Sequence, residues 1–421
     1  MRPILCLYFI FFSLHIAIFA QVQLPPWQEG FLDIHHISTG RGNAAYIIMP
    51  DGTTMMIDAG DISDTHPRTL SPRNTTRKPH ASPSTGYWIA DYIRQFAPAK
   101  RPQMLDYVLI THYHDDHFGE WDSTRPLAAN GGYHLTGIME VGDLIPIKTL
   151  IDRGFDFPID LKSLDFQERA LHDEYHIVQT LQAYWKFIDY HKKHHHLKNE
   201  ILQVGSKKQI QLQHKPSIFK DFEVRNLAVN GRIWTGFKDN DFYELYKEGQ
   251  YPGENPLSTC IKITYGKFDY FTGGDISGVN GWGEADFNSV EAHLAPVVGA
   301  VDVATLNHHG NRDALSAYFV RTLRPRVWVQ QSWSSDHPGE EVLRRITSDR
   351  IYPGKRDLFT TDMLEANELV IGERIANTYK SRHGHVVVRV YEQGAMYKIF
   401  ILNDQSEKRE VMMEFGPYES R

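Results

Sequence analysis

The stretch 111–120 holds three histidines and two aspartates, and it directly follows a short run rich in β-branched and aromatic residues. Such a run is typical of a buried strand, so these polar side chains stand where a strand ends. His112 and His114 are two residues apart and point to the same side of an extended segment. Asp116 and His117 follow within one turn. A site with room for two metal ions explains this density better than a solvated histidine-rich loop. Imidazole and carboxylate ligands without thiolate suit zinc, manganese or iron.

The chain before this motif predicts a meander of three strands at residues 31–38, 44–49 and 53–57, with glycine-bearing turns between them. The third strand runs into Asp58, which stands beside Ala and Gly. We expect its carboxylate to support one of the ligand histidines from behind. Residues 61–85 are rich in Ser, Thr, Pro, Arg and His and lack periodicity, which predicts a long loop that overhangs the site.

Later strands are also expected to end in ligand-type residues. They are predicted at 258–265, 268–272, 301–306 and 326–330. The hairpin formed by the first two ends at Asp275, after two glycines, and this carboxylate is a candidate to bridge two cations. The next strands lead to the pair His308 and His309 and then to His337, which precedes a proline and a helix. Strand ends that gather polar residues predict a layered α/β protein with one site along an edge.

The remaining periodic segments describe the rest of the fold. Helices are predicted at 87–96, 165–196, 285–294, 315–323 and 340–346, further strands at 209–212 and 222–227, and a hairpin at 386–402. The long helical pattern forms an insertion at about 160–198. It closes with three consecutive histidines at 194–196, which we interpret as a solvated helix end, because titratable groups suit the helix dipole there.

Composition bounds the class of protein. The 421 residues are 41% hydrophobic and 23% charged, with a formal net charge of -7, which argues against bulk electrostatic binding of long nucleic acid. Residues 1–20 have the layout of a secretory signal peptide, with an uncleaved anchor as the alternative. Cleavage would leave Cys260 as the one cysteine, which favours a bacterial periplasm over a disulfide-stapled scaffold. We therefore expect a secreted hydrolase domain over 21–421, with no stable membrane partner and no obligate protein partner.

The motifs as a set resemble the metallo-β-lactamase fold hydrolases. The resemblance rests on the spacing His-x-His-x-Asp-His at 112–117, with Asp58-Ala59-Gly60 before it and Gly274-Asp275 after it. It is similar in particular to the subgroup typified by the hydrolase domain of the competence protein ComEC, through Asn307-His308-His309-Gly310 and Asp336-His337-Pro338. The resemblance covers about residues 31–126 and 255–350. It implies a four-layer αββα sandwich with a dinuclear metal site between the sheets.

The resemblance also implies a role for each ligand. His112 and His114 would bind one ion, Asp116 and His117 the other, Asp275 would bridge, and either His308 or His309 would complete the second site. The chain departs from the family pattern where a separate metal histidine is usual, between the first motif and the bridging aspartate. The helical insertion and the absence of an accompanying membrane channel are further departures.

These features predict a secreted metal-dependent hydrolase. Two divalent cations, zinc first and manganese or iron as alternatives, would activate a water as hydroxide for attack on an electrophile. Asp116 could orient that hydroxide, and His337 is expected to donate a proton or contact a developing oxyanion. The ComEC resemblance favours a phosphodiester, in a small molecule or in nucleic acid. A lactone, β-lactam or thioester substrate is the alternative on the same site, and a non-catalytic binding protein is a third hypothesis.

Overall fold

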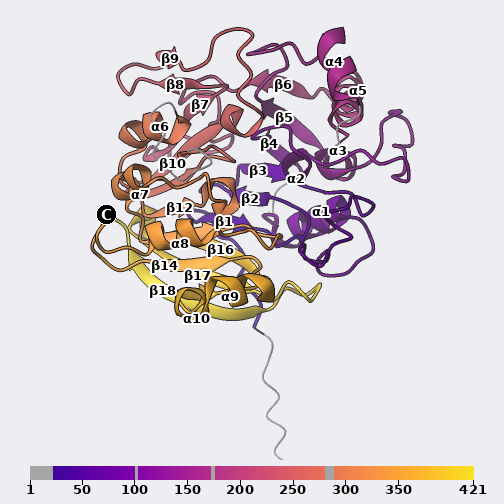
Figure 1. The fold of residues 1–421 in the computed structure, drawn as a ribbon. Helices are drawn as coiled ribbons and strands as arrows, with labels where there is room; N and C mark the ends of the chain where they lie inside the picture. The colour runs from indigo at the N-terminus through magenta and orange to yellow at the C-terminus, as the bar shows by residue number, and fades with distance from the viewer. Residues whose placement is uncertain (1–21, 100–102, 172–175, 280–288) are drawn as a thin grey trace, which may run out of the picture.

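The meander expected near the N-terminus forms in the computed structural model, which describes residues 22–99, 103–171, 176–279 and 289–421. Its second strand is antiparallel to the strands on either side, and parallel strands extend the sheet beyond the third. The C-terminal hairpin pairs with the first strand, so both ends of the described chain build one sheet (Figure 1). Its order is β18 (Val411–Glu419), β17 (Met396–Leu402), β16 (His385–Tyr391), β1 (Leu32–His36), β2 (Ala44–Ile48), β3 (Thr54–Ala59), β4 (Leu105–Leu109), β5 (Ile147–Asp152) and β6 (Lys198–Ile201).

The middle of the chain builds a second sheet. The predicted hairpin ending at Gly273 forms as β10 and β11, and four parallel strands continue from it. The order is β15 (Tyr379–Ser381), β14 (Asp357–Thr360), β13 (Val327–Gln330), β12 (Val303–Thr305), β11 (Phe268–Thr272), β10 (Cys260–Tyr265), β7 (Phe222–Val229), β8 (Arg232–Trp234) and β9 (Phe242–Glu244).

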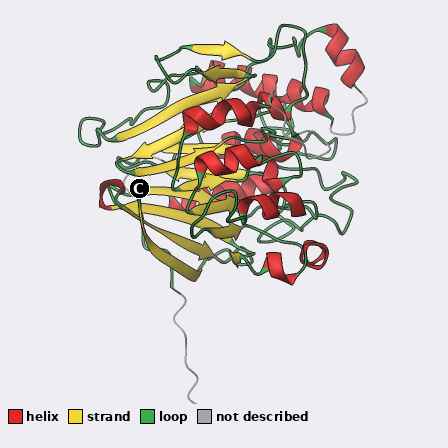
Figure 2. Cartoon of the chain, turned by 60° about the vertical axis from the view of Figure 1, so that its left-hand side comes forward, coloured by secondary structure: helices red, strands yellow, loops and turns green. Residues whose placement is uncertain are grey.

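Helices cover the outer face of each sheet. They are α1 (Thr85–Phe96), α2 (Asp115–Phe118), α3 (Gly137–Leu144), α4 (Leu164–Ala170), α5 (Ile177–His195), α6 (Val290–Val298), α7 (Ala317–Leu323), α8 (Glu340–Ile346), α9 (Glu365–Ile371) and α10 (Glu373–Ala376), with 3-10 turns η1 (Asn255–Leu257), η2 (Asn307–Gly310) and η3 (Glu392–Gly394). Figure 2 shows the strands lying side by side, with the helices next to them.

Three apolar cores account for the layering. Alternate side chains of the two sheets, such as Ile57 and Ile263, meet in a core between the sheets. A second core joins the first sheet to α1, α3 and α5, and a third joins the second sheet to α6, α7 and α8. Each sheet therefore buries both faces, as strands rich in Val, Ile and Leu on both sides require. The expected αββα sandwich is confirmed.

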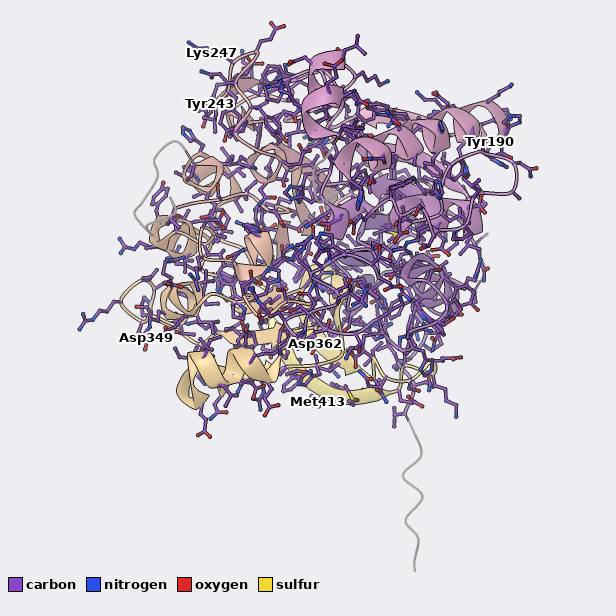
Figure 3. All side chains as sticks on the ribbon, turned by 45° about the vertical axis from the view of Figure 1, so that its right-hand side comes forward. Tyr190, Tyr243, Lys247, Asp349, Asp362 and Met413 are labelled. Atoms are coloured by element: carbon purple, nitrogen blue, oxygen red, sulfur yellow. The ribbon has the colours of Figure 1, made fainter. Side chains whose placement is uncertain are left out.

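The single helix predicted over 165–196 is wrong. The structure has α4 and α5, and α5 begins after His176, whose φ of 49° lies in the left-handed region. The apolar spacing continues across this break, so periodicity does not reveal it. A tertiary contact holds the start of α5, because His176 Nδ1 lies 3.1 Å from the buried Glu120 carboxylate. The helical insertion remains, and Figure 3 labels Tyr190 on α5, where it packs partly buried against the core one turn before the exposed histidine run.

The strand predicted over 209–212 is also wrong. Its backbone makes hydrogen bonds to a side chain instead of a strand ladder. Gln211 N–H donates to Tyr107 Oη at 3.2 Å, and the Tyr107 hydroxyl lies 3.2 Å from the Gln211 carbonyl oxygen. The predicted signal peptide lies outside the described residues, as do the first four residues of the helix predicted at 285–294. Among the described residues, no helix combines the length and apolarity that a membrane crossing requires.

Candidate metal centre

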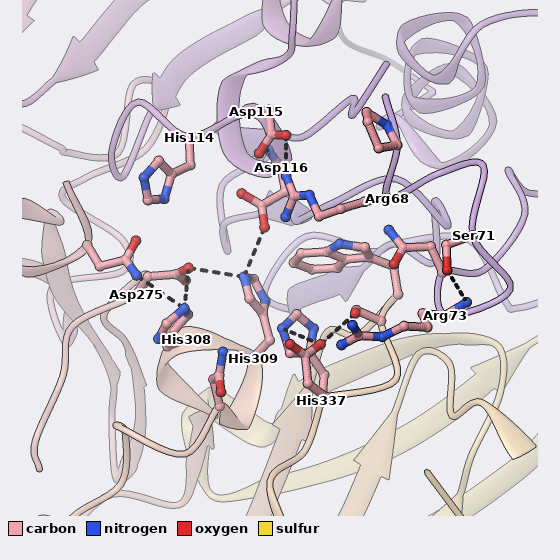
Figure 4. Close-up of a pocket in the computed structure, with 17 residues that line it drawn as sticks. Arg68, Ser71, Arg73, His114, Asp115, Asp116, Asp275, His308, His309 and His337 are labelled. Carbon is pink, nitrogen blue, oxygen red and sulfur yellow. Dashed lines mark hydrogen bonds and ion pairs between the residues drawn. The ribbon is translucent and has the colours of Figure 1, made fainter. Parts of the chain in front are cut away.

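Both sheets deliver polar residues to one edge of the sandwich. The first sheet contributes Asp58 near the end of β3 and the motif that follows β4. The second sheet contributes Asp275 after β11, the His308-His309 pair after β12, and His337 after β13. Figure 4 shows His114, Asp116, Asp275 and the later histidines lining one cavity, although they come from distant parts of the chain.

The motif is held in place by a close backbone approach. A Cβ atom on Gly60 would lie 1.9 Å from the Asp116 carbonyl oxygen, so only glycine permits this contact. The same carbonyl accepts a hydrogen bond from Asn43 N–H at 2.7 Å. Asp116 and His117 then lie on the short helix α2, which begins directly after His114. Gly60, two residues after Asp58, is therefore needed to bring the end of β3 against the motif.

Four donor groups converge at the centre of the edge. One donor atom each from Asp116, His117, Asp275 and His309 lies within 4.8 Å of the other three, and all four residues are buried. Nε2 of His117 is 3.1 Å from Nε2 of His309 and 3.2 Å from Oδ1 of Asp275. His309 Nε2 lies 3.2 Å from Asp275 Oδ2 and 3.7 Å from Asp116 Oδ2.

This group fits a divalent metal ion. Ligands about 2.05 Å from a tetrahedral zinc lie about 3.3 Å from one another, close to the separations found. Two ring nitrogens face each other, as ligands of one ion do. Asp275 Oδ1 is buried and, although His117 Nε2 lies 3.2 Å away, makes no hydrogen bond of adequate geometry among the described residues. Burial alone would lower the pKa of His117, but the Asp275, Asp116 and Asp58 carboxylates raise it well above the ordinary value. A cation would neutralise this concentrated negative charge.

Asp58 lies behind His117. Its Oδ2 is 2.8 Å from His117 Nδ1 and also accepts a hydrogen bond from the Thr111 hydroxyl at 2.8 Å. Oδ1 accepts from Thr111 N–H at 2.7 Å. This arrangement fixes the ring so that Nε2 faces the cluster, which is the supporting contact that metal-binding histidines commonly make.

We predict that Asp58→Asn weakens metal binding by about 10- to 100-fold, because the ring of His117 loses its charged partner. Metal affinity would be measured by competition with a chromophoric chelator. Asp106→Asn is a matched control, since Asp106 is buried in the same sheet and accepts a hydrogen bond from Thr54 N–H, away from the cluster. Equal affinities of the Asp58→Asn variant and the wild type would contradict a supporting role.

His112 and His114 form a neighbouring pair of donors. His112 Nε2 is 3.1 Å from His114 Nδ1 and 3.8 Å from Asp275 Oδ2. Burial lowers the pKa of His112 well below its ordinary value, which keeps this ring in the neutral form that binds metals. Asp275 thus stands between this pair and the four-donor cluster, as a bridging ligand would.

The structure separates the two histidines of η2. His309 belongs to the four-donor cluster, whereas His308 approaches Asp275 Oδ2 at 3.9 Å and is paired through Nδ1 with Asp313 Oδ1 at 2.6 Å. Sequence reasoning left open which of the two is a ligand. The cluster geometry favours His309 for the site that contains Asp116 and His117.

His337 lies beside the cluster. Its ring centroid is 4.8 Å from that of His309 and 4.9 Å from that of Trp333, and it lines the cavity. Burial, with the nearby His309, lowers the pKa of His337 to about 3. The ring is neutral at pH 7, so it suits an N–H hydrogen bond to a bound anion better than donation of a proton.

The loop at 61–85 reaches the cavity, as predicted. It contributes Arg68 and Arg73 to the lining of a cavity of about 470 Å³. Arg68 is ion-paired with Asp115, and Arg73 Nε donates to Ser335 Oγ at 3.2 Å. Sequence patterns do not identify these arginines, because a loop without periodicity does not show which residues face inward.

A second buried group lies next to the motif. His66, Asp115 and Glu120 each offer a donor atom within 4.8 Å of the other two. Burial and the neighbouring Asp115 raise the pKa of Glu120 to about 8. The Arg68 guanidinium forms an ion pair with Asp115 and so already places a positive charge beside this group. Sequence patterns do not identify the group.

No protein-family model matches the chain, and no curated protein matches it. Among solved structures, the chain is similar to a crystal structure from Parabacteroides distasonis ATCC 8503, described as a presumed metal-dependent hydrolase. The two are 12% identical with a TM-score of 0.32, and the match covers 78% of this chain and 92% of that chain. Because a likeness at this level does not define an activity, we rely on the residues of this chain.

The layering and the site define a class. The chain is an αββα sandwich of mixed α/β type whose sheet edges bring together a buried His/Asp group suited to a divalent metal.

Proposed function

We propose that this chain is a metal-dependent hydrolase of phosphodiester bonds in small molecules. The observation that carries the proposal is that three members of the four-donor cluster, Asp116, Asp275 and His309, line the same cavity as Arg68 and Arg73. Guanidinium groups match phosphate geometry through paired N–H donors. The rest of the lining is mainly polar, with Trp333 and Pro67 as its apolar members.

The cavity size favours a small substrate. About 470 Å³ lies within the usual range for small-molecule sites, roughly 300–1,000 Å³. The net charge of -7 gives no bulk attraction for long nucleic acid. The sequence resemblance to ComEC hydrolase domains also favours a phosphodiester, and membership of that subgroup is part of what we propose.

Each residue has a proposed task. Two divalent ions, zinc first and manganese or iron as alternatives, would supply an activated water and offset charge on the leaving oxygen. Asp116, His117, Asp275 and His309 would hold one ion, and His112 and His114 would begin the second site. The neutral His337 ring would donate a hydrogen bond to a phosphoryl oxygen, and Arg73 would orient the phosphate from the loop above.

The substrate class is tested by assaying the metal-loaded full chain and the Arg73→Ala variant on a generic aryl phosphodiester, a lactone and single-stranded DNA. We expect metal-dependent cleavage of the aryl phosphodiester. Arg73→Ala should raise its KM about tenfold, the effect of losing roughly 1.4 kcal/mol from one charge-assisted hydrogen bond. Arg169→Ala, on the exposed helix α4, is the matched control.

Metal-dependent cleavage of the lactone alone would refute the phosphodiesterase proposal and favour the acyl alternative. Cleavage of DNA with no turnover of the small phosphodiester would refute the small-molecule assignment. No turnover of any substrate at full metal loading would favour a non-catalytic binding protein.

A further inference from the structure

The backbone of η2 has an uncommon shape. Both His308 and His309 lie in the left-handed region, with φ of 46° and 53°. Non-glycine residues rarely adopt this conformation, which occurs in tight turns, as at Glu392 and Gln393 of η3, and at functional sites. The turn directs both histidine side chains toward Asp275, as Figure 4 shows, although they are neighbours in sequence. A role for His309 alone would not explain why His308 is also held there.

The His308 ring is oriented as metal-binding histidines commonly are. Its Nδ1 lies 2.6 Å from Asp313 Oδ1, which leaves Nε2 to face the centre. Nε2 lies 3.1 Å from the Asn255 side-chain nitrogen and 3.9 Å from Asp275 Oδ2. The ring is mostly buried, with 19% of the side chain exposed, so it borders the cavity instead of projecting into solvent.

Asp275 Oδ2 also lies near His112, which forms with His114 the donor pair that lacks a third histidine. His112 Nε2 lies 3.8 Å and His308 Nε2 lies 3.9 Å from Asp275 Oδ2, an oxygen that His309 Nε2 also approaches at 3.2 Å, as expected of a carboxylate between two ions. The turn η1 connects the two rings. Its Asn255 contacts His308, and Ser258 just after it lies 3.3 Å from His112 Nδ1 through its hydroxyl. Both rings are therefore held around Asp275 by one short segment.

We propose that His308 supplies the third histidine ligand of the metal ion bound at His112 and His114. It takes the place of the separate metal histidine that the metallo-β-lactamase fold hydrolases usually have between the first motif and the bridging aspartate, and that this sequence lacks. Asp313 is a positioning residue that orients the His308 ring. The adjacent histidines of η2 then serve different ions, His309 the ion at Asp116 and His117, and His308 the other. This inference rests on the proposed metal centre.

Metal stoichiometry and affinity test the proposal without an activity assay. The full chain, His308→Ala and His309→Ala would be loaded with Co²⁺, dialysed, and measured by elemental analysis and visible absorption. We expect two equivalents in the wild type. His308→Ala should retain one equivalent and bind the second at least 100-fold more weakly, and its spectrum should differ from that of His309→Ala. His308→Asp, which restores a ligand, should recover the second equivalent.

Two further variants separate a ligand from a structural residue. Asp313→Asn keeps the imidazole but removes its carboxylate partner, so the second ion should bind about 10- to 100-fold more weakly. His134→Ala should change neither equivalent, because His134 contacts the Arg125 carbonyl away from the cluster. Thermal unfolding of the metal-free proteins would identify any variant that fails to fold, and Asp313→Asn then carries the test.

Unchanged stoichiometry and affinity in both His308→Ala and Asp313→Asn would overturn the inference and assign His308 to an ion pair with Asp313, with the proposed function intact. A wild type that binds one equivalent, lost in His309→Ala and kept in His308→Ala, would also overturn it. A wild type that binds no divalent metal would refute the proposed function itself.

Discussion

Asp275→Ala is expected to lower the turnover of metal-dependent hydrolysis on the order of 10³-fold. This loss corresponds to about 4 kcal/mol of transition-state stabilisation. The carboxylate lies 3.2 Å from both His117 and His309 and 3.8 Å from His112, so it stands between the four-donor cluster and the His112 pair. Its removal should lower the bound metal as well as the rate. Turnover of an aryl phosphodiester and elemental analysis of the same sample would measure both.

Asp269→Ala is the matched control for this change. Asp269 lies on β11, the strand that leads to Asp275, but its carboxylate pairs with Lys262 at 3.0 Å, away from the cluster. Its variant should keep its metal and its rate. An Asp275→Ala protein that retains full metal content and turnover would show that the cluster is not the reaction centre.

Glu254→Gln is expected to lower the free energy of unfolding by about 3–5 kcal/mol, because it leaves a buried guanidinium without its counter-charge. Glu254 forms a two-point ion pair with Arg153, with N–O distances of 2.5 and 2.8 Å, and both side chains are almost fully buried. The same carboxylate accepts a hydrogen bond from Tyr113 N–H inside the metal motif. Urea denaturation followed by circular dichroism would measure the loss.

The exposed pair Glu340–Arg344 on α8 provides the control. Arg344→Gln removes an ion pair in solvent and should change the free energy of unfolding by less than about 0.5 kcal/mol. Equal effects of the two substitutions would contradict a structural role for the buried pair.

The pH dependence of the Glu254 effect has a definite sign. Burial alone would raise the pKa of Glu254, but the Arg153 guanidinium outweighs it and holds this pKa below the ordinary 4.5. A lowered folded-state pKa adds stability above the unfolded value and loses it as pH falls through the folded value. The difference between wild type and Glu254→Gln should therefore be constant from pH 6 to 8 and decrease below about pH 4.5.

Local patterns were sufficient where the interaction is local. Alternation and apolar runs predicted the strands of the meander, the hairpin of β10 and β11, and the hairpin of β16 and β17, because each strand's neighbour is close in sequence. Periodicity failed at the break between α4 and α5, where a contact from Glu120 to His176 decides the start of a helix. Strand alternation also gave a wrong prediction at 209–212, where the Tyr107 side chain on β4 forms hydrogen bonds with the Gln211 backbone.

The motif at 112–117 determined by itself that this chain concentrates metal ligands at a strand end, because the spacing of those residues places them within two turns of backbone. The tertiary structure decided which donors meet. His117 and His309 are 192 residues apart and lie 3.1 Å from each other only because two separate sheets pack face to face. It also decided that both histidines of η2 point toward Asp275, and that Arg68 and Arg73 face the cavity. Such contacts depend on the packing of distant segments, which local sequence patterns do not encode.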